Sequence, residues 1–560
     1  MSSPSASRAA VTRYHDGTKH AFHGYARSLG YLDWASQPHP FRAFTGAPVI
    51  PLYPAPSAVP AGYAPRFTTY TQLFGSVDSA APVNAGAIGD VLRHSLGLSA
   101  WKHYGTSRWS LRVNPSSGNL HPTEAYVICG AVSGLAATPA VYHYAADRHA
   151  LERRCVVDEI AWRSEFDRAD IVLVAFTSIH WREAWKYGER AFRYCQHDLG
   201  HAIAATSLAA TLVGWHAVLL PAWSHRSIAS LTGIDRDEDF TEAEREEPGC
   251  IMALGPPGGH LFLSERHRFV EAVRNGHWSG RASRLSDDHV QWTFIDAVAA
   301  ATEDQGRGDL PPSDTRDRPA ARGGNGDADR LDARAIILQR RSALAFDGHS
   351  RMERATFFNI VSRAMPAAHA PWTALWWGAR IHLLLFVHRV NDVVPGLYLL
   401  ARHPDALDSL KAACGRELLW EAAHDRLPFV CLARGDCRRL AARLSCDQDI
   451  AADGFFSLGM LAQFDASLDL YGPSFYRNLF WESGAVGHVL YLEAEAIGAR
   501  ATGIGCFFDD PVHDLLGLQE HAFQSLYHFT VGMPVEDARI TREPGYAWEL
   551  TSGECAAPPG

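Results

Sequence analysis

The sequence predicts an α+β protein in which two copies of one module fold together as a pseudo-dimer within a single chain. The 560 residues exceed what one hydrophobic core usually holds, so we expect two domains of roughly 200–250 residues each. Runs rich in β-branched and aromatic residues, typical of strands, accompany long helical patterns in both halves. In addition, part of the first half recurs 284 positions later in the second.

The repeat needs no gap over its best stretch. The matched pairs are Tyr187 with Tyr471, Gly188 with Gly472, Arg193 with Arg477, Gly200 with Gly484 and Gly214 with Gly498. A looser echo relates residues 139–142 to residues 395–398. Chance hardly supplies all of these matches, and we therefore expect the two halves to share one fold.

Composition shifts divide the chain into four parts. Residues 1–60, rich in Pro, Ser, His and aromatic residues, are expected to form an extended arm draped on the first domain, which spans residues 61–275. A linker over residues 276–331 follows. Within it, residues 303–330 are crowded with Asp, Arg, Gly and Pro, which predicts a solvated and mobile segment. Residues 332–550 form the second domain.

Periodicity places the main elements. The first half is predicted to form a helix and then a polar turn within residues 85–135, strands at 125–129, 141–144 and 171–176, a long helix over 187–213, and a closing strand at 252–255. The second is predicted to form a helix over 335–342, strands at 381–387 and 429–432, and a helix over 481–499. The apolar stretch 202–220 is Ala-rich and interrupted by polar residues, so we expect a packed helix and no membrane span.

Bulk composition narrows the function classes. The chain is 47% hydrophobic and 20% charged, with a formal net charge of −10, which gives no basic surface for nucleic acid. Ten cysteines are scattered without a C-x-x-C pair, as expected for reduced thiols in a cytoplasmic protein. The N-terminus lacks the apolar core of a signal peptide.

The segment RVNPSSGNLHPTEAY, residues 112–126, predicts a rigid polar turn. Prolines fix φ, Gly118 removes a Cβ atom, and Ser116, Ser117 and Asn119 offer short polar side chains to a ligand. An ordinary surface turn is the alternative on spacing alone. The sequence of this segment resembles the Pro-Ser-Ser-x-Asn-x-x-Pro segment of the flavin-dependent nitroreductase superfamily. Within that superfamily it is most similar to the segment of the SagB/ThcOx-type dehydrogenases.

This resemblance covers most of residues 85–255 and 332–545 and implies two tandem nitroreductase-like domains that bind FMN. In that superfamily, the Pro-Ser-Ser segment reaches across a dimer interface to the FMN held by the partner subunit. The second half here contains Arg340, Arg341 and Ser342, which resemble the Arg-Arg-Ser opening signature. Two guanidiniums and a hydroxyl near a helix start suit a phosphate, although solvated helix arginines are an open alternative.

The second half also contains a glycine segment, residues 501–508, that matches the loop beside the flavin ring in the superfamily. At the same offset, the first half reads Ala-Val-Leu-Leu-Pro over residues 217–221, which argues against a flavin there. The resemblance thus implies one complete FMN site per chain, shared between the halves. Its residues are Pro115, Ser116, Ser117 and Asn119 from the first half, with Arg340, Arg341, Ser342, Thr502, Gly503, Ile504, Gly505 and Arg539 from the second.

Lys186 and Tyr187 are the catalytic candidates. They resemble the Lys-Tyr pair of SagB-type dehydrogenases, the proposed acid/base machinery for oxidising azolines to azoles, and the second half has Leu470 at the lysine position. A helix-start lysine that points to water is the alternative. Cys506 lies closest to the expected flavin ring.

A histidine pair and an aspartate pair are weaker candidates for metal binding. His197 and His201 have the spacing of a zinc helix, but Asp198 replaces the usual Glu and no third ligand follows, so we expect no metal. Asp509 and Asp510 could bind a cation or begin a solvated helix.

Three functions follow from the resemblance. The first is an FMN-dependent oxidoreductase that transfers hydride between flavin and a small or peptide-derived heterocycle. The second is an NAD(P)H-dependent reductase of nitro or quinone compounds. The third is a non-catalytic flavin-binding scaffold.

Overall fold

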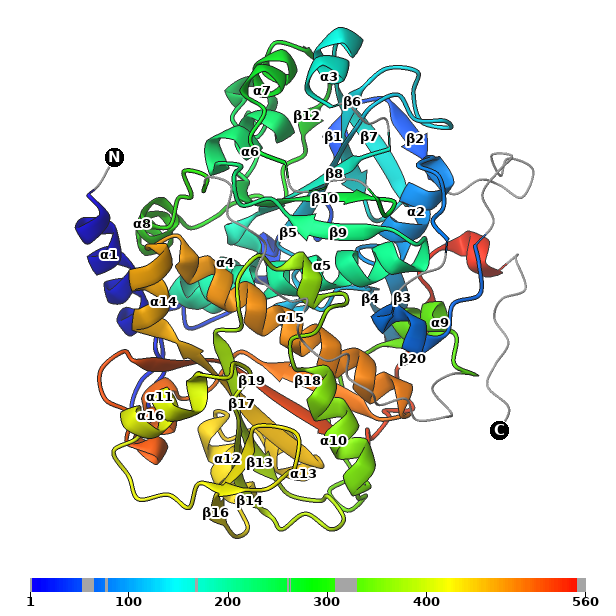
Figure 1. The fold of residues 1–560 in the computed structure, drawn as a ribbon. Helices are drawn as coiled ribbons and strands as arrows, with labels where there is room; N and C mark the ends of the chain where they lie inside the picture. Colours follow the sequence, from blue (N-terminus) through cyan, green and yellow to red (C-terminus); the bar gives the residue numbers. More distant parts are fainter. Residues whose placement is uncertain are drawn as a thin grey trace.

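The computed structural model describes residues 3–52, 65–75, 79–166, 170–258, 261, 263–307 and 330–550. Two sheet-containing halves lie on either side of a pair of long helices, α5 (Ala191–Leu212) and α15 (Phe475–Ala496), which pack against each other at the centre (Figure 1). One hydrophobic core cluster runs through both helices and reaches both sheets. The two halves therefore share a core and do not fold as separate beads.

The first half is an antiparallel sheet with the strand order β11-β7-β6-β5-β8-β10-β9, with β2 also paired to β7. Alternate residues of its strands face opposite sides: Val127 joins the core shared with α5, and Ile128 joins the core under α3, α6 and α7. The strands are β1 (Phe44–Thr45), β2 (Val49–Pro51), β3 (Leu98–Tyr104), β4 (Ser107–Arg112), β5 (Thr123–Cys129), β6 (Ala140–Ala145), β7 (Ala150–Val156), β8 (Val172–Ser178), β9 (His216–Leu219), β10 (Glu247–Gly255), β11 (His277–Trp278) and β12 (Arg281–Ala282). The other helices are α1 (Pro4–Gly17), α2 (Ala85–Arg93), α3 (Glu159–Glu165), α4 (His180–Tyr187), α6 (His225–Thr232), α7 (His267–Arg274) and α8 (Thr293–Ala301).

The second half repeats this plan with the strand order β15-β16-β14-β13-β17-β19-β18. Its strands are β13 (Ile381–Val387), β14 (Gly396–Leu400), β15 (Glu421–Ala422), β16 (Phe429–Arg434), β17 (Phe456–Gln463), β18 (Arg500–Ile504) and β19 (Phe523–Gly532). Its helices are α9 (Ala333–Gln339), α10 (Arg354–Arg363), α11 (Ala406–Ala413), α12 (Arg438–Leu444), α13 (Ile450–Asp453), α14 (Phe464–Tyr471), α15 and α16 (Asp509–Leu516).

The internal repeat is visible in the element boundaries. Both ends of α14, α15 and α16 lie 284 residues after the corresponding ends of α4, α5 and α6. The two halves thus carry the same helices at the same spacing, which confirms the predicted α+β fold with two tandem modules.

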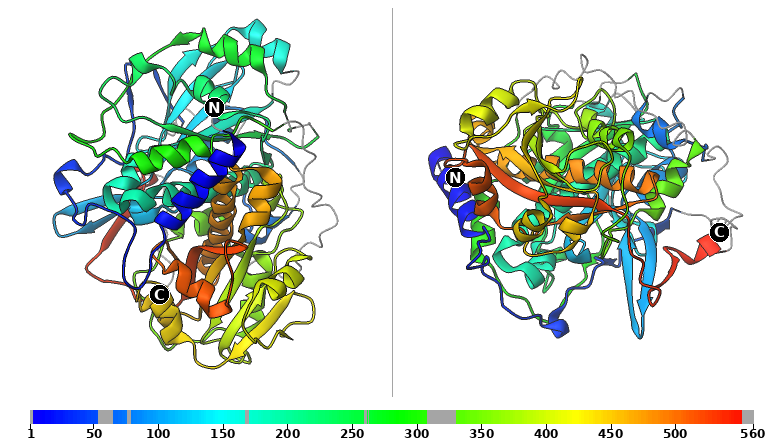
Figure 2. Two further views of the ribbon diagram at one scale, coloured as in Figure 1. Left: turned by 90° about the vertical axis from the view of Figure 1, so that its left-hand side faces the viewer. Right: turned by 90° about the horizontal axis from the view of Figure 1, so that it is seen from below.

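The chain ends tie the halves together. Helix α1 runs beside α8 and α14, where Arg8 forms an ion pair with Asp465 (Figure 2). At the other end, β20 (Thr541–Pro544) leaves the second half and pairs with β3 of the first. Beyond β20, the hydroxyl of Tyr546 donates to Ala146 O at 2.6 Å. Each half is therefore held by a segment that belongs to the other end of the sequence.

Several expectations need correction. The N-terminal arm is not extended throughout, because α1 begins at Pro4 with Ser3 as its N-cap. Part of the expected linker is structured: residues 276–307 include β11, β12 and α8, whereas residues 308–329 lie outside the described residues. The hairpin β3–β4 was not predicted. In the described part of the chain, no helix combines the length and apolarity that a membrane crossing requires.

Candidate functional site

The Pro-Ser-Ser turn is a tight connection between β4 and β5. Gly118, Asn119 and His121 all have left-handed φ angles, of 58°, 61° and 53°. Side chains hold this unusual course: Asn119 Nδ2 donates to Ser110 O at 2.8 Å, and the His121 N–H donates to Ser116 Oγ at 2.8 Å. The predicted rigidity of the turn therefore has a direct cause in its own polar side chains.

Asp198 anchors the turn to the central helix α5. Its carboxylate accepts the Ser117 N–H at 3.0 Å and the Ser117 hydroxyl at 3.0 Å. Burial raises the pKa of Asp198 to about 7 despite these hydrogen bonds. Burial and the neighbouring Asp198 also raise the pKa of Glu183 well above its usual value. Sequence reasoning missed both carboxyls, although the HDLGH motif that contains Asp198 had drawn attention for another reason.

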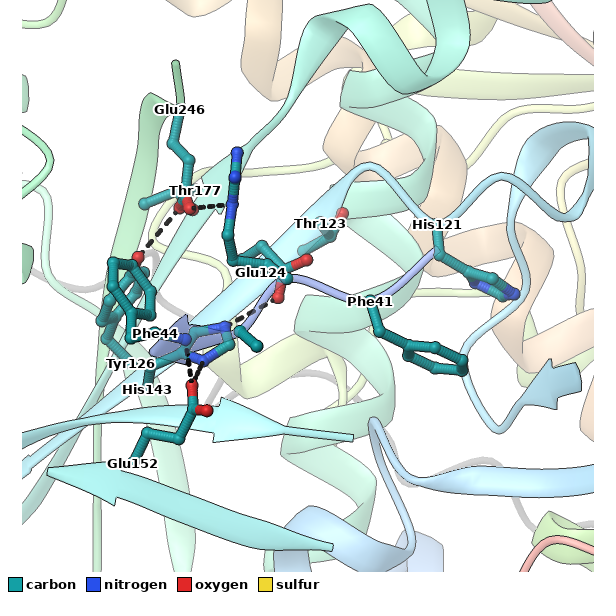
Figure 3. Close-up of polar contacts among 12 residues, drawn as sticks. Phe41, Phe44, His121, Thr123, Glu124, Tyr126, His143, Glu152, Thr177 and Glu246 are labelled. Carbon is teal, nitrogen blue, oxygen red and sulfur yellow. Dashed lines mark hydrogen bonds and ion pairs between the residues drawn. The ribbon is translucent and has the colours of Figure 1, made fainter. Parts of the chain in front are cut away.

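A buried polar network supports the strand that follows the turn. Figure 3 shows His143 between Glu124 of β5 and Glu152 of β7, at 2.9 and 2.8 Å, and Glu246 joined to Tyr126 and Thr177. Burial lowers the pKa of His143, but its hydrogen bonds to Glu124 and Glu152 outweigh that effect and raise the pKa to about 9.

Arg182 links this network to the turn. The guanidinium is fully buried, forms an ion pair with Glu124 and donates to His121 O at 2.7 Å. Because the buried charges compensate one another, β5 and the turn have one stable relative position.

Lys186 and Tyr187 end α4 next to the turn. A Cβ atom built on Gly118 would lie 2.6 Å from Tyr187 Oη and 3.2 Å from Lys186 Nζ, so only glycine fits there. Lys186 is exposed to solvent, and its Nζ lies 5.2 Å from the centre of the Tyr187 ring. The expected acid/base pair therefore lies against the Pro-Ser-Ser turn while it remains accessible from outside.

Arg340, Arg341 and Ser342 follow the end of α9 and do not begin a helix, which corrects the expected placement. Arg340 is buried and donates to Val113 O at 3.1 Å and to Arg112 O at 3.2 Å. Because Arg112 and Val113 directly precede the Pro-Ser-Ser turn, Arg340 joins the two predicted parts of the site across the domain boundary. The alternative of solvated helix arginines is thereby excluded for Arg340 and Arg341, which are both buried.

Arg341 and Ser342 line a small pocket with three further cations, Lys102, Arg500 and Arg542, and with two carboxylates, Glu536 and Asp537. Burial, and then the neighbouring Arg340 and Arg542, lower the pKa of Arg341 well below its usual value. Its Nε is buried and has no hydrogen-bond partner among the described residues. Four cations against two carboxylates leave a surplus of positive charge beside the buried Arg341, which favours an anion.

Arg539 is not among the residues that line this pocket. It pairs with Asp537 at 2.7 Å, and 72% of its side chain is exposed. The basic residue from the C-terminal part that lines the pocket is Arg542, on β20.

Residues 501–504 of the glycine segment lie in strand β18, and residues 505–508 form a loop after it, so the expected loop is present only in the second part. Thr502 Oγ1 donates to Ala343 O at 2.8 Å, and the Gly503 N–H donates to Tyr491 Oη at 2.9 Å. The same Tyr491 hydroxyl lies 2.9 Å from Ser342 Oγ, so one tyrosine connects the pocket of Arg341 and Ser342 to the glycine segment.

Both glycines of this segment face tyrosine side chains. Cβ atoms built on Gly503 and Gly505 would lie 2.0 Å from Tyr527 Oη and 2.1 Å from Tyr194 Cε1. The centroids of the Tyr194 and Tyr187 rings lie 4.5 Å apart. Tyr194 therefore connects the glycine segment to Tyr187, which lies beside the Pro-Ser-Ser turn. The structure thus brings together the turn, the Lys-Tyr pair, the Arg-Arg-Ser segment and the glycine segment, which span more than 380 sequence positions.

The other acidic and histidine motifs have structural partners. The His197 ring stacks on Tyr527 with centroids 4.1 Å apart, and His201 Nε2 lies 3.2 Å from Tyr527 Oη. Among the described residues, no group of three or more His, Cys, Asp or Glu side chains is placed to hold a metal ion. Asp509 and Asp510 begin helix α16, as the alternative reading expected, and Asp510 is exposed. Asp509 is not solvated: it is buried and forms ion pairs with Arg190 and Arg193.

Known proteins resemble both halves of the chain in sequence or fold. The sequence model of the Nitroreductase family matches residues 80–255 and 337–533, one match in each half and together more than half of the chain. The chain belongs to the nitroreductase family. Both matches fall on the repeated modules, so the nitroreductase fold is present twice.

Individual relatives are more distant. A Methanocaldococcus jannaschii protein named as a putative nitroreductase is 28% identical over 158 residues, which cover 27% of this chain and 73% of that protein. The crystal structure of a putative nitroreductase from Anabaena variabilis superimposes with a TM-score of 0.65 at 19% identity and covers 94% of this chain and 99% of that one. That structure shares the fold over both halves of this nitroreductase.

Proposed function

We propose that this nitroreductase binds one FMN non-covalently between its halves and acts as an oxidoreductase on a small or peptide-derived heterocycle. The observation that carries the proposal is the pocket formed by Arg341, Ser342 and Arg542, which Arg340 and Tyr491 join to the two other parts of the expected site. A phosphate group satisfies such a set of donors better than any neutral ligand.

The residues present fit the phosphate end of FMN. The unpartnered Nε of Arg341 is a buried donor that a phosphate oxygen can satisfy, and Ser342 offers a hydroxyl beside it. Lys102 and Arg542 supply further positive charge from the first half and from the C-terminal strand. We assign to Arg542 the role that the sequence had suggested for Arg539.

We place the ring end of FMN, when bound, between Gly503 and the Pro-Ser-Ser turn. Tyr194, Tyr491 and Tyr527 line this region, and Tyr491 holds the Gly503 N–H. We assign Pro115, Ser116, Ser117 and Asn119 to one side of the ring, and Thr502, Gly503, Ile504 and Gly505 to the other. Tyr527 packs directly against Gly503 and Tyr194 against Gly505, so no larger residue fits at either position.

FMN, when bound, supplies the hydride-transfer chemistry. Lys186 Nζ is the group that can accept or return a substrate proton, because it is exposed and lies beside Gly118 of the turn. Burial raises the pKa of Tyr187 well above its usual value, so its phenol keeps its proton and can donate a hydrogen bond to a substrate. Tyr187 therefore orients the substrate, and Lys186 moves its proton.

The visible spectrum of the purified full chain tests this proposal. We expect about one FMN per chain, released on denaturation, and a flavin band that NADPH does not bleach under anaerobic conditions. Rapid bleaching by NADPH would transfer the assignment to the NAD(P)H-dependent reductase. A colourless protein that takes up no added FMN would contradict the flavin site altogether.

A further inference from the structure

Two half-exposed thiols meet beside the glycine segment. The sulfur atoms of Cys446 and Cys506 lie 2.7 Å apart, although the residues are 60 positions apart in sequence. Cys446 lies in the loop between α12 and α13, and Cys506 follows β18. A disulfide has a sulfur–sulfur distance of about 2.05 Å, so a displacement of less than about 1 Å would join the two atoms.

The surroundings of Cys506 favour its thiolate form. The Ala26 N–H donates to His20 Nδ1 at 2.9 Å, which leaves the ring proton on Nε2, available for the hydrogen bond between His20 and Cys506. The hydrogen bond with Cys446, followed by those of His20 and the charge of Arg190, lowers the pKa of Cys506, and the same pairing raises the pKa of Cys446. Cys506 is therefore the nucleophile and Cys446 its proton-bearing partner.

The two loops are already held in position. Gln448 Nε2 donates to Cys506 O at 3.1 Å and to Ser445 O at 2.8 Å, which bridges one loop to the other. Cys446 and Asp447 both adopt left-handed φ angles, of 55° and 56°, which non-glycine residues rarely do. The surrounding structure thus imposes a conformation that places the Cys446 thiol on Cys506.

The remaining described cysteines differ from this pair. Six of them are buried, and for Cys129, Cys155 and Cys250 burial alone or chiefly raises the pKa of the thiol. Cys414 is half-exposed, but burial raises its pKa as well. Buried or protonated thiols react slowly, so Cys506 is distinguished by both access and ionisation.

We propose that Cys446 and Cys506 form a redox-active dithiol that undergoes thiol–disulfide exchange with small disulfides. The Cys506 thiolate attacks one sulfur of the small disulfide, forms a mixed disulfide and releases one thiolate, which takes a proton from solvent. Cys446 then loses its proton and attacks the Cys506 sulfur, which releases the second small thiol and leaves the Cys446–Cys506 disulfide. Two electrons pass from the protein to the small disulfide, and a dithiol reductant reverses the exchange.

This site is separate from the proposed flavin chemistry but adjoins it. Cys506 directly follows Gly505, whose carbonyl accepts a hydrogen bond from Arg190 at 3.2 Å. Formation of the disulfide would tie the 445–449 loop covalently to the end of the glycine segment.

The exchange can be tested on the full chain with oxidised glutathione as the probe, thiol counting after denaturation, and peptide mass spectrometry. We expect the wild type to lose two thiols per chain and to yield a linked Cys446–Cys506 peptide pair, which dithiothreitol separates. Cys446→Ser should lose one thiol and trap glutathione on Cys506. Cys506→Ser should lose none, and Cys414→Ser, a matched half-exposed control, should still form the Cys446–Cys506 link.

An unchanged thiol count in the folded wild type, or a link between other cysteines, would overturn the proposal. Glutathione trapped on Cys446 in the Cys506→Ser variant, with none on Cys506 in Cys446→Ser, would overturn the assignment of the nucleophile. Thiol counting does not depend on a bound flavin, so the outcome is independent of the FMN measurement.

Discussion

Gly200 and Gly484, which the sequence repeat relates to each other, touch at the crossing of the two central helices. A Cβ atom built on Gly484 would lie 2.8 Å from Gly200 Cα, and one built on Gly200 would lie 2.4 Å from Trp481 O. Equivalent residues of a two-fold dimer meet in this way on its symmetry axis. The contact between them therefore marks the pseudo-two-fold axis of a dimer fused into one chain.

Replacing Gly200 by alanine tests this close approach. We expect Gly200→Ala to lower the free energy of unfolding by about 1–3 kcal/mol or more, because the backbone of α15 cannot yield without parting the helices. Gly24→Ala is the control, since a Cβ atom there meets nothing within 4 Å. Denaturant midpoints of both variants would show whether the helix contact is as tight as described.

Substitutions of Arg341 and Arg539 test which of the two arginines contributes to FMN binding. Arg341→Ala should weaken FMN binding by about 10–100-fold, the loss expected for charge-assisted hydrogen bonds. Arg539→Ala should leave binding unchanged, because that side chain is largely exposed and does not line the pocket. Fluorescence titration with FMN measures both, and equal losses in the two variants would place the phosphate elsewhere.

Lys186→Ala should reduce turnover by about 100-fold or more without loss of bound flavin, since it removes a proton-transfer group and none of the proposed cofactor contacts. Lys411→Ala, which removes a lysine that lies over Trp420 in the second half, provides the matched control. Flavin content and single-turnover rates should be measured on the same preparations. Full activity in Lys186→Ala would leave Tyr187 or solvent as the proton carrier.

Asp198 holds the Pro-Ser-Ser turn through Ser117, and its burial disfavours the ionised carboxylate. Its pKa of about 7, raised from 3.8 chiefly by burial, means that the folded protein favours the neutral acid, and stability is lost as pH rises through 7. Asp198→Asn should therefore be at least as stable as the wild type at pH 8, while its amide oxygen still accepts from Ser117. Asp198→Ala should lose about 1–3 kcal/mol, because the Ser117 N–H and hydroxyl lose their acceptor. Unfolding curves at pH 5 and pH 8 distinguish these expectations.

His143 gives a pH dependence in a different window. Its raised pKa of about 9 stabilises the fold fully below its ordinary value of 6.5, and this contribution disappears as pH rises from 6.5 to 9. The loss is on the order of 3 kcal/mol. His143→Gln should flatten the stability profile between these pH values, and a wild-type profile without any slope there would show that His143 is neutral in the network.

The sequence by itself determined the fold class, the duplication and the main elements. Helices and strands follow from local periodicity, and a repeat is a comparison of the chain with itself, so neither needs spatial information. The amino-acid sequences of the Pro-Ser-Ser turn and of Arg340–Ser342 also indicated the family. Both segments were chosen for chemistry that is carried by consecutive residues.

Only the tertiary structure decided which side chains act together. Asp198 clamps Ser117 across 81 residues, and Cys446 meets Cys506 across 60, so no local pattern could reveal either pair. Arg542 lines the pocket of Arg341 and Ser342 and Arg539 does not, because β20, which carries Arg542, crosses to pair with β3. The physical reason is the same in each case: burial and pairing are properties of position in space, and sequence distance does not encode them.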